Sequence, residues 1–553
     1  MSNDHGEIDV APTESKTTGT IGNFPHGSRE TPVTSASFMG ADRSEKARGH
    51  KSDMDVGGES HSFIVPKKPA NKGRVPGPAE LVEGRELTKE NTEQSLLGRT
   101  QSRKSDGRPL EARSRGLLGV REAARREKRQ RFTSLLHHLT AERLRASFFE
   151  LKKQAAPGID GETWGEYAVD YERRIEDLHR RIHRGAYRAK PSKRSYVPKP
   201  EGGMRPLGLA ALEDKIVQQA ARTVLECIYE PEFLGFSYGY RPGRGSHQAL
   251  DALFVGISRR KVNWIIDADI RGFFDNISHQ WLMKFVEHRI ADKRILRLLK
   301  KWLRAGVSED GEWSATKVGT PQGAVISPLF ANVFLHYVLD LWIDNWRKRQ
   351  AKGEVIIVRY ADDFVIGFRE ESDARRCLAV LGERLAKFGL ELHAEKTRLI
   401  EFGRYAEERR AKRGDGPPET FDFLGFTHIS GKTLGGEFTI HRRTSRKKFQ
   451  AKLAEPKETL SRRRHDDLAR VGEWLQSVYR GWCQYYAVPG NGARLQQFRA
   501  AIQVMWLRNL QRRSQRGRRL TWAKFSKLCK RWLPTPKILH PYPSVRFACQ
   551  HPR

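Results

Sequence analysis

The sequence predicts an α+β fold followed by a helical, strongly basic region. Between about 190 and 430, short apolar runs of strand length alternate with helical segments and Gly/Pro turns. From about 441 the pattern is helical, and residues 441–540 hold 25 Lys and Arg against 5 Asp and Glu. The 553-residue chain has a formal net charge of +35, so more than half of the excess lies in this fifth. Such a surplus favours a polyanionic partner, RNA or DNA rather than an anionic membrane.

Several classes of protein are disfavoured by the composition. No apolar run approaches the roughly 18–20 residues of a membrane span. No charged start followed by an apolar run indicates a secretory signal. The five cysteines are scattered without a CxxC pair, which disfavours a zinc knuckle and a disulfide framework. We therefore expect no membrane partner and a cytoplasmic, reducing location.

Four regions are expected along the chain. Residues 1–110 are rich in Gly, Ser, Thr, Pro and charge without periodicity, so we expect them to be disordered. Residues 111–189 have apolar residues at three- and four-residue spacing, as in "RFTSLLHHLTAERLRASFFELKKQ", which predicts a helical extension. Residues 190–430 hold the alternating strands and helices. Residues 431–553 interleave Trp and Tyr with basic residues, a combination that favours nucleic acid through phosphate contacts and stacking.

About half of the aromatic residues in the basic region are expected to form core. The remainder, with the densest Arg run, are candidates for RNA contact. These RNA-binding candidates are Trp482, Tyr485, Tyr486, Arg512, Arg513, Arg516, Arg518 and Arg519.

Acidic residues stand inside two predicted apolar strands. In "EVIIVRYADDFVIGF", Asp362 and Asp363 separate two apolar runs, and taken alone they fit an exposed turn better than a site. In "NWIIDADIRGFFD", the two-residue period puts Asp267 and Asp269 on one face of the strand and apolar residues on the other. Two strands that each deliver carboxylates can hold two hard divalent cations such as Mg²⁺. A pair of such ions serves phosphoryl transfer.

Other segments supply what nucleotide binding would need. "VPKPEGGMRPLGL" puts Lys199 and Arg205 on either side of a Gly-Gly turn, where the two cations could clamp a triphosphate. "VGTPQGAVISPLFANVFL" joins a Pro/Gly loop to a helix. In that loop, Gly319 and Gly323 allow close backbone approach, and Gln322 could bond to a base or template.

The segments "RPLG", "DADIRGFF", "GTPQGAVISPLFAN" and "YADD" occur in this order and resemble reverse transcriptases. More narrowly, the chain resembles the intron-encoded reverse transcriptase/maturases of bacterial group II introns. "FSYGYRPGRGSHQAL", "GLELHAEKTRLIEFGR", "FDFLGFTH" and "RGWCQYYAVPGN" carry this closer likeness, which runs from about 90 to the end. It implies a right-hand polymerase: fingers and palm with an antiparallel palm sheet over 190–430, then an all-helical thumb, or maturase domain, over 431–553. Because no paired cysteines follow, we expect no endonuclease domain.

The resemblance also implies roles for single residues. It chooses Asp269 over Asp267, because Asp269 lies five residues before Phe274, the position that resembles a steric gate against a ribose 2′-OH. Asp267 stays without a role. The implied catalytic residues are Asp269, Asp362 and Asp363; the implied metal-binding set is Asp269, Ile270, Asp362 and Asp363; the implied dNTP-binding residues are Lys199, Arg205, Phe274, Gln322 and Lys396. Lys396 resembles a lysine that protonates the leaving pyrophosphate.

The expected function is therefore RNA-directed DNA polymerisation with two Mg²⁺ ions, in which a primer 3′-OH attacks a dNTP. The expected partners are an RNA template with its DNA primer and a group II intron RNA whose splicing and mobility the protein assists. We expect it as a ribonucleoprotein in a bacterial cytoplasm, with target DNA and a second copy as further partners. The alternatives are a maturase that acts as an RNA chaperone with vestigial polymerase activity, and a domesticated reverse transcriptase of antiviral defence.

Overall fold

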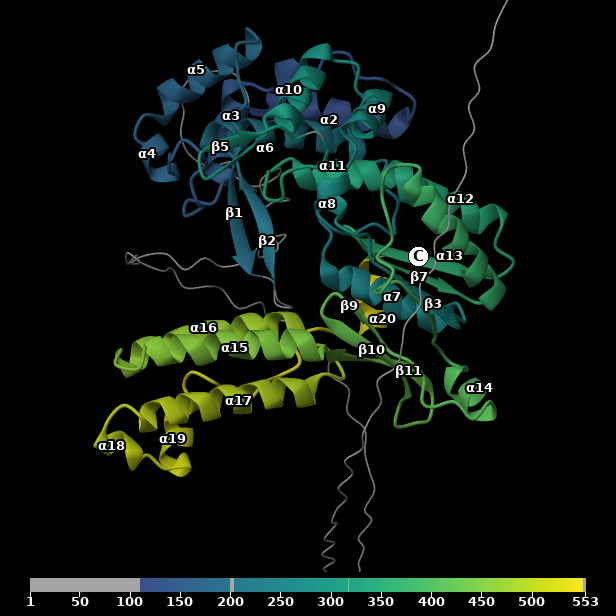
Figure 1. Cartoon of the computed structure of the whole chain (residues 1–553), viewed down its shortest axis with the longest axis vertical. Coiled ribbons are helices and arrows are strands. Elements are labelled where there is room, and N and C mark those ends of the chain that lie inside the picture. Colours follow the sequence, from purple (N-terminus) through teal and green to yellow (C-terminus); the bar gives the residue numbers. More distant parts are fainter. Residues whose placement is uncertain (1–109, 199–202, 317, 551–553) are drawn as a thin grey trace, which may run out of the picture. The chain divides into compact units, whose positions relative to one another are not determined.

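The structure, a computed structural model, describes residues 110–198, 203–316 and 318–550 (Figure 1). The chain divides into two units, Met1–Pro78 and Ala79–Arg553, and every described residue belongs to the second. The region 1–110 that we predict to be disordered lies outside the described residues except for Leu110. Lys199 lies outside them as well.

The described residues form helices and strands in the alternating order that the sequence predicts. The helices are α2 (Leu110–Arg126), η1 (Leu136–His138), α3 (Ala141–Glu150), α4 (Trp164–Ala168), α5 (Tyr171–His183), α6 (Leu212–Tyr229), α7 (Ser246–Arg259), α8 (Phe273–Asn276), α9 (His279–Arg289), α10 (Lys293–Arg304), α11 (Ser327–Leu335), η2 (His336–Asp340), α12 (Leu341–Arg349), α13 (Glu371–Ala386), α14 (Ala406–Lys412), α15 (Arg446–Arg462), α16 (Leu468–Tyr486), α17 (Gly492–Gln511), α18 (Gln515–Arg518), α19 (Trp522–Cys529) and α20 (Pro543–Gln550). The strands are β1 (Ser192–Pro198), β2 (Met204–Leu209), β3 (Trp264–Ala268), β4 (Val307–Glu309), β5 (Glu312–Ser314), β6 (Val355–Tyr360), β7 (Asp363–Phe368), β8 (Arg398–Glu401), β9 (Phe421–Phe423), β10 (Phe426–Lys432) and β11 (Phe438–Thr444).

The strands build three sheets. The first has the order β2-β1-β4-β5 and is mixed, because β1 pairs with β4 in parallel. The second has the order β6-β7-β3-β8, and all its pairs are antiparallel. The third, β11-β10-β9, is antiparallel too. The second sheet contains both acidic strands, and we call it the palm sheet.

The palm sheet is buried on both faces. Residues of β3 and β7 alternate between two core clusters: Ile266 and Ile366 pack in one with residues of α13, and Ile265 and Val365 pack in the other with residues of α7. Strands covered on both faces read as continuous apolar runs, which is the pattern of these two segments. By the two-residue period, the acidic positions of β3 and the first residue of β7 share the α7 face.

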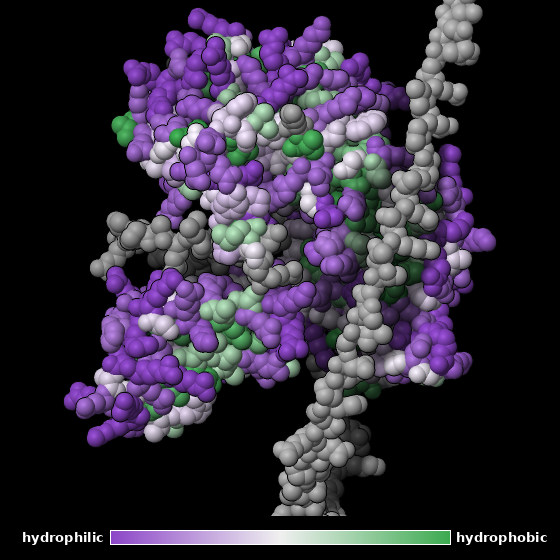
Figure 2. Space-filling model, in the orientation of Figure 1, coloured by the Kyte–Doolittle hydropathy of each residue, from purple (hydrophilic) through white to green (hydrophobic). Residues whose placement is uncertain are grey.

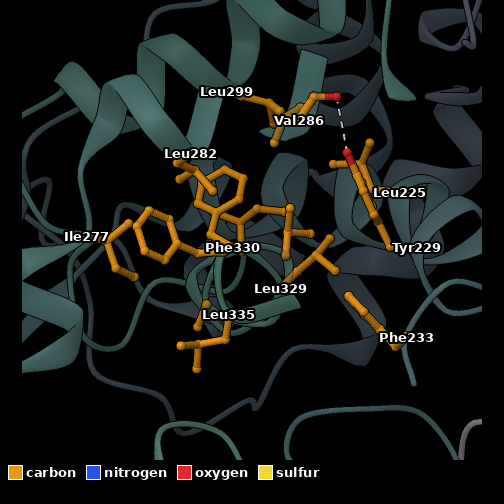
Figure 3. Close-up of a cluster of buried hydrophobic side chains, with 14 of the residues drawn as sticks. Leu225, Tyr229, Phe233, Ile277, Leu282, Val286, Leu299, Leu329, Phe330 and Leu335 are labelled. Carbon is orange, nitrogen blue, oxygen red and sulfur yellow. Dashed lines mark hydrogen bonds between the residues drawn. The ribbon is translucent and has the colours of Figure 1, made fainter. Parts of the chain in front are cut away.

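Helices next to the palm sheet form a large apolar core. Figure 3 shows side chains from α6, α9, α10 and α11 meeting there, among them Leu225, Val286, Leu299 and Phe330. The hydroxyl of Tyr229 donates a hydrogen bond of 3.2 Å to the carbonyl of Val286 at its edge. This core fixes the helices that precede the palm strands and the helix that follows the loop before α11.

The C-terminal region contains three long helices, α15, α16 and α17, which lie side by side in Figure 1. Helix α16 begins at an N-cap, where the Asp467 carboxylate accepts hydrogen bonds from the backbone N–H groups of Ala469 and Arg470. The prediction of an all-helical region from 431 is wrong at its start. Strand β11 lies within it, because the alternating sequence "FTIHRRT" pairs along β10 and extends the third sheet.

The last helix returns to the palm. Helix α20 packs on α7, and the guanidinium of Arg546 on α20 donates to both oxygens of Asp251 on α7. Arg442 on β11 donates to the same carboxylate at 3.1 Å. Asp251 is fully buried, and the two cations neutralise it. The strand that enters the C-terminal region and the helix that ends it therefore share one carboxylate.

No helix in the described residues combines the length and the hydropathy that a bilayer crossing requires.

Candidate active site

The predicted acidic residues meet at one end of the palm sheet. Strands β6 and β7 pair up to Tyr360 and Asp363, so Ala361 and Asp362 form a two-residue turn between them. Ala268 of β3 pairs with Phe364 of β7. The next position on each of these two strands is then Asp269 and Asp363. The structure thus brings together the three carboxylates that the sequence predicts.

The turn has a strained backbone. Ala361 has φ of 59°, a left-handed conformation that residues with a Cβ rarely adopt. Gly239 packs directly against it, since a Cβ at Gly239 would lie 2.3 Å from the Ala361 nitrogen. Strain of this kind persists only where the surroundings hold it in place.

A buried arginine provides part of that hold. The guanidinium of Arg359 donates to the Ala361 carbonyl at 2.9 Å and to Asn332 Oδ1 at 3.1 Å. Its other nitrogens donate to both oxygens of Asp340, at 2.7 and 2.5 Å, and both side chains are 0% exposed. The side chain of Asn332 in turn donates to the carbonyl of Gly239 at 2.8 Å. This network, which we call the Arg359 bracket, fixes the turn from behind.

The carboxylates of the turn are held with an excess of negative charge. Burial raises the pKa of Asp362, and the neighbouring Asp269 raises it further, while Arg205 lowers it. Burial also raises the pKa of Asp363 well above its usual range, and repulsion from the other carboxylates adds to the rise. A site that is short of positive charge by itself suits a bound cation or a cationic partner.

Asp269 is paired in this structure. Lys396 Nζ lies 2.8 Å from Asp269 Oδ2, and the carboxylate side chain is 38% exposed. The backbone N–H of His393 donates to the Asp269 carbonyl, and Ile270 forms an isolated bridge with Leu392. The segment before β8 therefore runs along the end of β3 and delivers the predicted lysine to the predicted aspartate. Ile270 itself is buried.

Asp267 lies on the same face but has a different partner. Arg398 Nη2 lies 3.3 Å from Asp267 Oδ2, and the Asp267 side chain is 16% exposed. Burial raises its pKa to about 6, against the opposing effect of Arg398. Asp267 is thus a neighbour of the three carboxylates whose charge is partly offset by Arg398.

The loop before α11 connects the other predicted residues. The N–H of Thr320 donates to the Phe274 carbonyl at 2.8 Å, and the N–H of Gly208 on β2 donates to the Gln322 carbonyl at 2.7 Å. Gly319 has φ of 88° and no room for a Cβ, which would lie 2.7 Å from the carbonyl of Asp275. One loop therefore ties the partly buried Phe274 to the strand that carries the exposed Arg205.

One residue that contacts Asp363 is not among the predicted site residues. A backbone hydrogen bond from Leu424, in the turn between β9 and β10, lowers the pKa of Asp363 against the effect of burial. Leu424 has φ of 48°, and its carbonyl accepts a 2.8 Å hydrogen bond from the hydroxyl of Tyr485 on α16. In the sequence, this contact is indicated only by "FDFLGF", in which a Leu-Gly pair marks a turn.

The structure places two of the three predicted aromatic RNA contacts in the core, and the third is half-buried. Trp482 and Tyr486 are 5% and 8% exposed and pack in the core of the C-terminal helices, because α16 turns that face toward α15 and α17. Tyr485 is half-buried against Phe426 and donates to Leu424 instead. Trp522, at 48% exposure, is an exposed aromatic that we did not predict.

Four of the five predicted arginines remain exposed on or beside α18: Arg512, Arg516, Arg518 and Arg519. Arg513 instead donates to the carbonyl of Asp466 at 2.9 Å. Figure 2 shows that hydrophilic residues predominate at the end of the molecule where α18 lies. The basic surface predicted near the end of α17 is thus present, without the aromatic residues expected beside it.

The three carboxylates at the end of the palm sheet are the candidate ligands for a metal ion. Among the residues that the structure describes, no three His, Cys, Asp or Glu side chains are drawn together closely enough to hold one. The three carboxylates nevertheless fit a hard divalent cation in two respects: they supply oxygen ligands, and burial and mutual repulsion raise the pKa values of Asp362 and Asp363, so a bound cation would stabilise the charged forms of these two.

Known proteins with similar sequences point to the same kind of active site. The family model for reverse transcriptase (RNA-dependent DNA polymerase) matches residues 197–428. Protein YkfC of Escherichia coli (strain K12) is 34% identical over 276 residues, which cover 44% of this chain and 72% of YkfC. The group II intron-encoded protein LtrA of Lactococcus lactis subsp. cremoris is 39% identical over 236 residues, or 41% of this chain and 38% of LtrA.

A more distant match is nuclear intron maturase 4, a mitochondrial protein of Arabidopsis thaliana, at 30% identity over 131 residues, 23% of this chain and 16% of the relative. The chain thus spans well under half the length of LtrA and of nuclear intron maturase 4. Reverse transcriptases as a class use divalent metal ions and act on nucleic acid, in agreement with the carboxylates and the basic surface. The family model, the match to 72% of the length of YkfC and the likeness to an intron-encoded protein agree with one another. This chain belongs to the group II intron reverse transcriptase/maturase family.

Proposed function

We propose that the chain is an RNA-directed DNA polymerase that extends a primer 3′-OH with dNTPs on an RNA template. The observation that carries the proposal is the convergence of Asp269, Asp362 and Asp363 on neighbouring strands, with Arg205 close enough to lower the pKa of Asp362. Phosphoryl transfer needs little covalent chemistry from the protein, only positioned charge of this kind.

Asp269, Asp362, Asp363 and the carbonyl of Ile270 would hold two Mg²⁺ ions. When bound, such ions lower the pKa of an attacking hydroxyl and offset the charge of a leaving pyrophosphate. The protein's part is to fix the carboxylates in advance. The Arg359 bracket holds the turn, and the segment 391–396 holds the end of β3.

The residues around the carboxylates bind and select the nucleotide in this proposal. Arg205 on β2 pairs with the triphosphate, and Lys199 acts beside it. Phe274 excludes a ribose 2′-OH, because its aromatic ring occupies the space that the hydroxyl would need. Gln322 packs near the template and the incoming base, on a loop that hydrogen-bonds to the strand of Arg205.

Lys396 has two roles in sequence. Before substrate binds, its ammonium group neutralises Asp269 across 2.8 Å. With nucleotide in the site, the ammonium group would donate a proton to the departing pyrophosphate oxygen. A general acid of this type contributes about 10²–10⁴-fold to a rate.

The test is primer extension by purified protein on poly(rA)/oligo(dT) with dTTP and Mg²⁺. Asp362→Asn and Asp363→Asn are expected to lose nearly all incorporation. Asp415→Asn is the matched control, because Asp415 is 42% exposed and its ion pair is with Arg413, away from the three carboxylates in sequence. Equal incorporation by Asp362→Asn and wild type would end the polymerase proposal.

A second activity, binding of the group II intron RNA to assist its splicing and mobility, is favoured by the exposed arginines around α18. This activity needs no carboxylates, so Asp362→Asn should still stimulate splicing of the intron in vitro. Loss of that stimulation in Asp362→Asn would count against a separate maturase activity. We place the protein in the bacterial cytoplasm as a ribonucleoprotein with its intron; target DNA and a second copy of the chain are further proposed partners.

A further inference from the structure

A basic groove lies on elements that carry none of the three carboxylates. It has a volume of about 860 Å³ and is bounded by α10, the end of α9 and the segment 188–191. The lining includes six cationic side chains and one carboxylate, Glu287: the cations are Arg188, Lys293, Arg297, Lys300, Lys301 and Arg304. The floor is apolar and includes Leu296 and Pro191.

The charge of this groove is left largely unbalanced. Glu287 pairs with Lys300 at 3.3 Å, and Lys301 donates to the carbonyls of Gly185 and Tyr187. Within the described part of the chain, the other four cations have no carboxylate at ion-pair distance. They are Arg188, Lys293, Arg297 and Arg304, and all four are exposed. Such a group repels itself, and burial together with Arg297 and Arg188 lowers the pKa of Lys301.

The sequence of α10 explains the arrangement. "KRILRLLKKWLR" turns Ile295, Leu298, Leu299 and Trp302 into the core and leaves a polar face made of basic residues alone. A solvated helix face usually mixes both signs, which gains ion pairs along the helix. A face with one sign only is suited to an extended polyanion.

We propose that this groove binds the phosphate backbone of a folded RNA, at a site separate from the carboxylates that act on the primer. Four free cations beside an apolar floor suit phosphates with sugar edges against Leu296 and Pro191. An acidic protein segment would offer carboxylates at irregular spacing and no sugar edges for Leu296 and Pro191, so RNA is the favoured partner. The proposal deepens the proposed RNA binding and does not depend on polymerase activity.

The test compares two triple variants of the full chain. The groove variant is Lys293→Gln/Arg297→Gln/Arg304→Gln. The control variant, Arg259→Gln/Arg349→Gln/Lys387→Gln, removes the same charge from exposed residues of α7, α12 and the end of α13. Binding is measured by anisotropy with a labelled RNA hairpin of about 16 base pairs, the length over which duplex-binding modules reach. Melting temperatures check that both variants fold.

The groove variant is expected to bind the hairpin about 10- to 100-fold more weakly, and its plot of log K against log salt should flatten by about 2–3 units, since each phosphate contact contributes about 0.7–0.9. The control variant should bind as wild type does. Extension of oligo(dT) on a short oligo(rA) template should stay unchanged in both.

Three outcomes would overturn the proposal. Equal loss in both triple variants would mean that net charge alone attracts RNA. Loss of short-template extension in the groove variant would place the groove on the primer–template path. Displacement of the hairpin by poly-glutamate of equal charge would favour an acidic protein. If wild type bound the hairpin through the groove but extended no primer, the proposed polymerase function would fail and this inference would stand.

Discussion

The Arg359 bracket gives a sharp prediction about stability. Arg359→Met removes the guanidinium and leaves the Asp340 carboxylate, which is 0% exposed, without its bidentate partner. Breaking a buried pair by removing one member costs about 3–5 kcal/mol, since a charge stays buried and uncompensated. That is a large share of the roughly 5–15 kcal/mol that stabilise a domain. At about 2–4 °C per kcal/mol, the melting temperature should fall by about 6–20 °C.

The partner substitution separates charge from packing. Arg359→Met/Asp340→Leu removes both charges, so most of the lost stability should return, because a buried ion pair and an apolar pair of similar volume are often equivalent. The double variant still lacks the hydrogen bond to the Ala361 carbonyl. Its primer extension should therefore stay about 10- to 100-fold below wild type although it melts normally, as expected when reacting groups are slightly misplaced.

The matched control is Arg375→Met on α13. Arg375 pairs with Glu371, but the two side chains are 67% and 41% exposed, and exposed pairs contribute about 0–1 kcal/mol. Differential scanning fluorimetry on the three variants and wild type makes the comparison. The reasoning is refuted if Arg359→Met melts like Arg375→Met, or if the double variant is no more stable than the single one.

Three further results are expected. Gly239→Ala should abolish primer extension, since its Cβ would lie 2.3 Å from the Ala361 nitrogen, whereas Gly235→Ala, which meets nothing within 4 Å, should be as active as wild type; equal activities would contradict the close packing. Tyr485→Phe should lose about 0.5–1.5 kcal/mol of stability by chemical denaturation and keep wild-type RNA affinity, and a drop in affinity alone would restore its predicted RNA contact. Burial raises the pKa of Asp214 from 3.8 to about 6, so the folded state binds the carboxyl proton more tightly than the unfolded state does. The bound proton stabilises the folded state fully below about pH 3.8, and this contribution is lost as the pH rises through 6. Asp214→Asn should therefore gain about 3 kcal/mol relative to wild type between pH 3.8 and 7.5 in melting experiments, and a pH-independent difference would contradict the assigned pKa.

The palm strands could be predicted because the pattern that specifies them lies within short stretches of sequence. Two apolar runs with acidic residues at two-residue spacing allow few arrangements, and the expected convergence of Asp269 with Asp363 follows once the strands pair. The Arg359 bracket could not be predicted in this way. An arginine in an apolar strand gives no indication of whether it faces water or Asp340, which lies 19 positions earlier on another element.

The aromatic residues of α16 could not be assigned for a related reason. Trp482, Tyr485 and Tyr486 have i, i+3, i+4 spacing and therefore lie on one face of the helix, but the spacing does not say whether that face meets the core or a partner. Packing against α15 and α17 decides it, and those helices lie on either side in the chain. Contact between Leu424 and Asp363 likewise depends on a turn whose backbone points its N–H at the palm.

The shared carboxylate Asp251 makes the C-terminal helices a closed loop rather than a free arm. β11 and α20 are both pinned to it, so the roughly one hundred residues between them begin and end at one point of α7. Closing a loop of this length costs only a few kcal/mol in chain entropy, which the two buried ion pairs can offset. A segment fixed at both ends can change its orientation, but its ends cannot move away from Asp251. Any adjustment of these helices to a bulky duplex must therefore leave β11 and α20 in place beside α7.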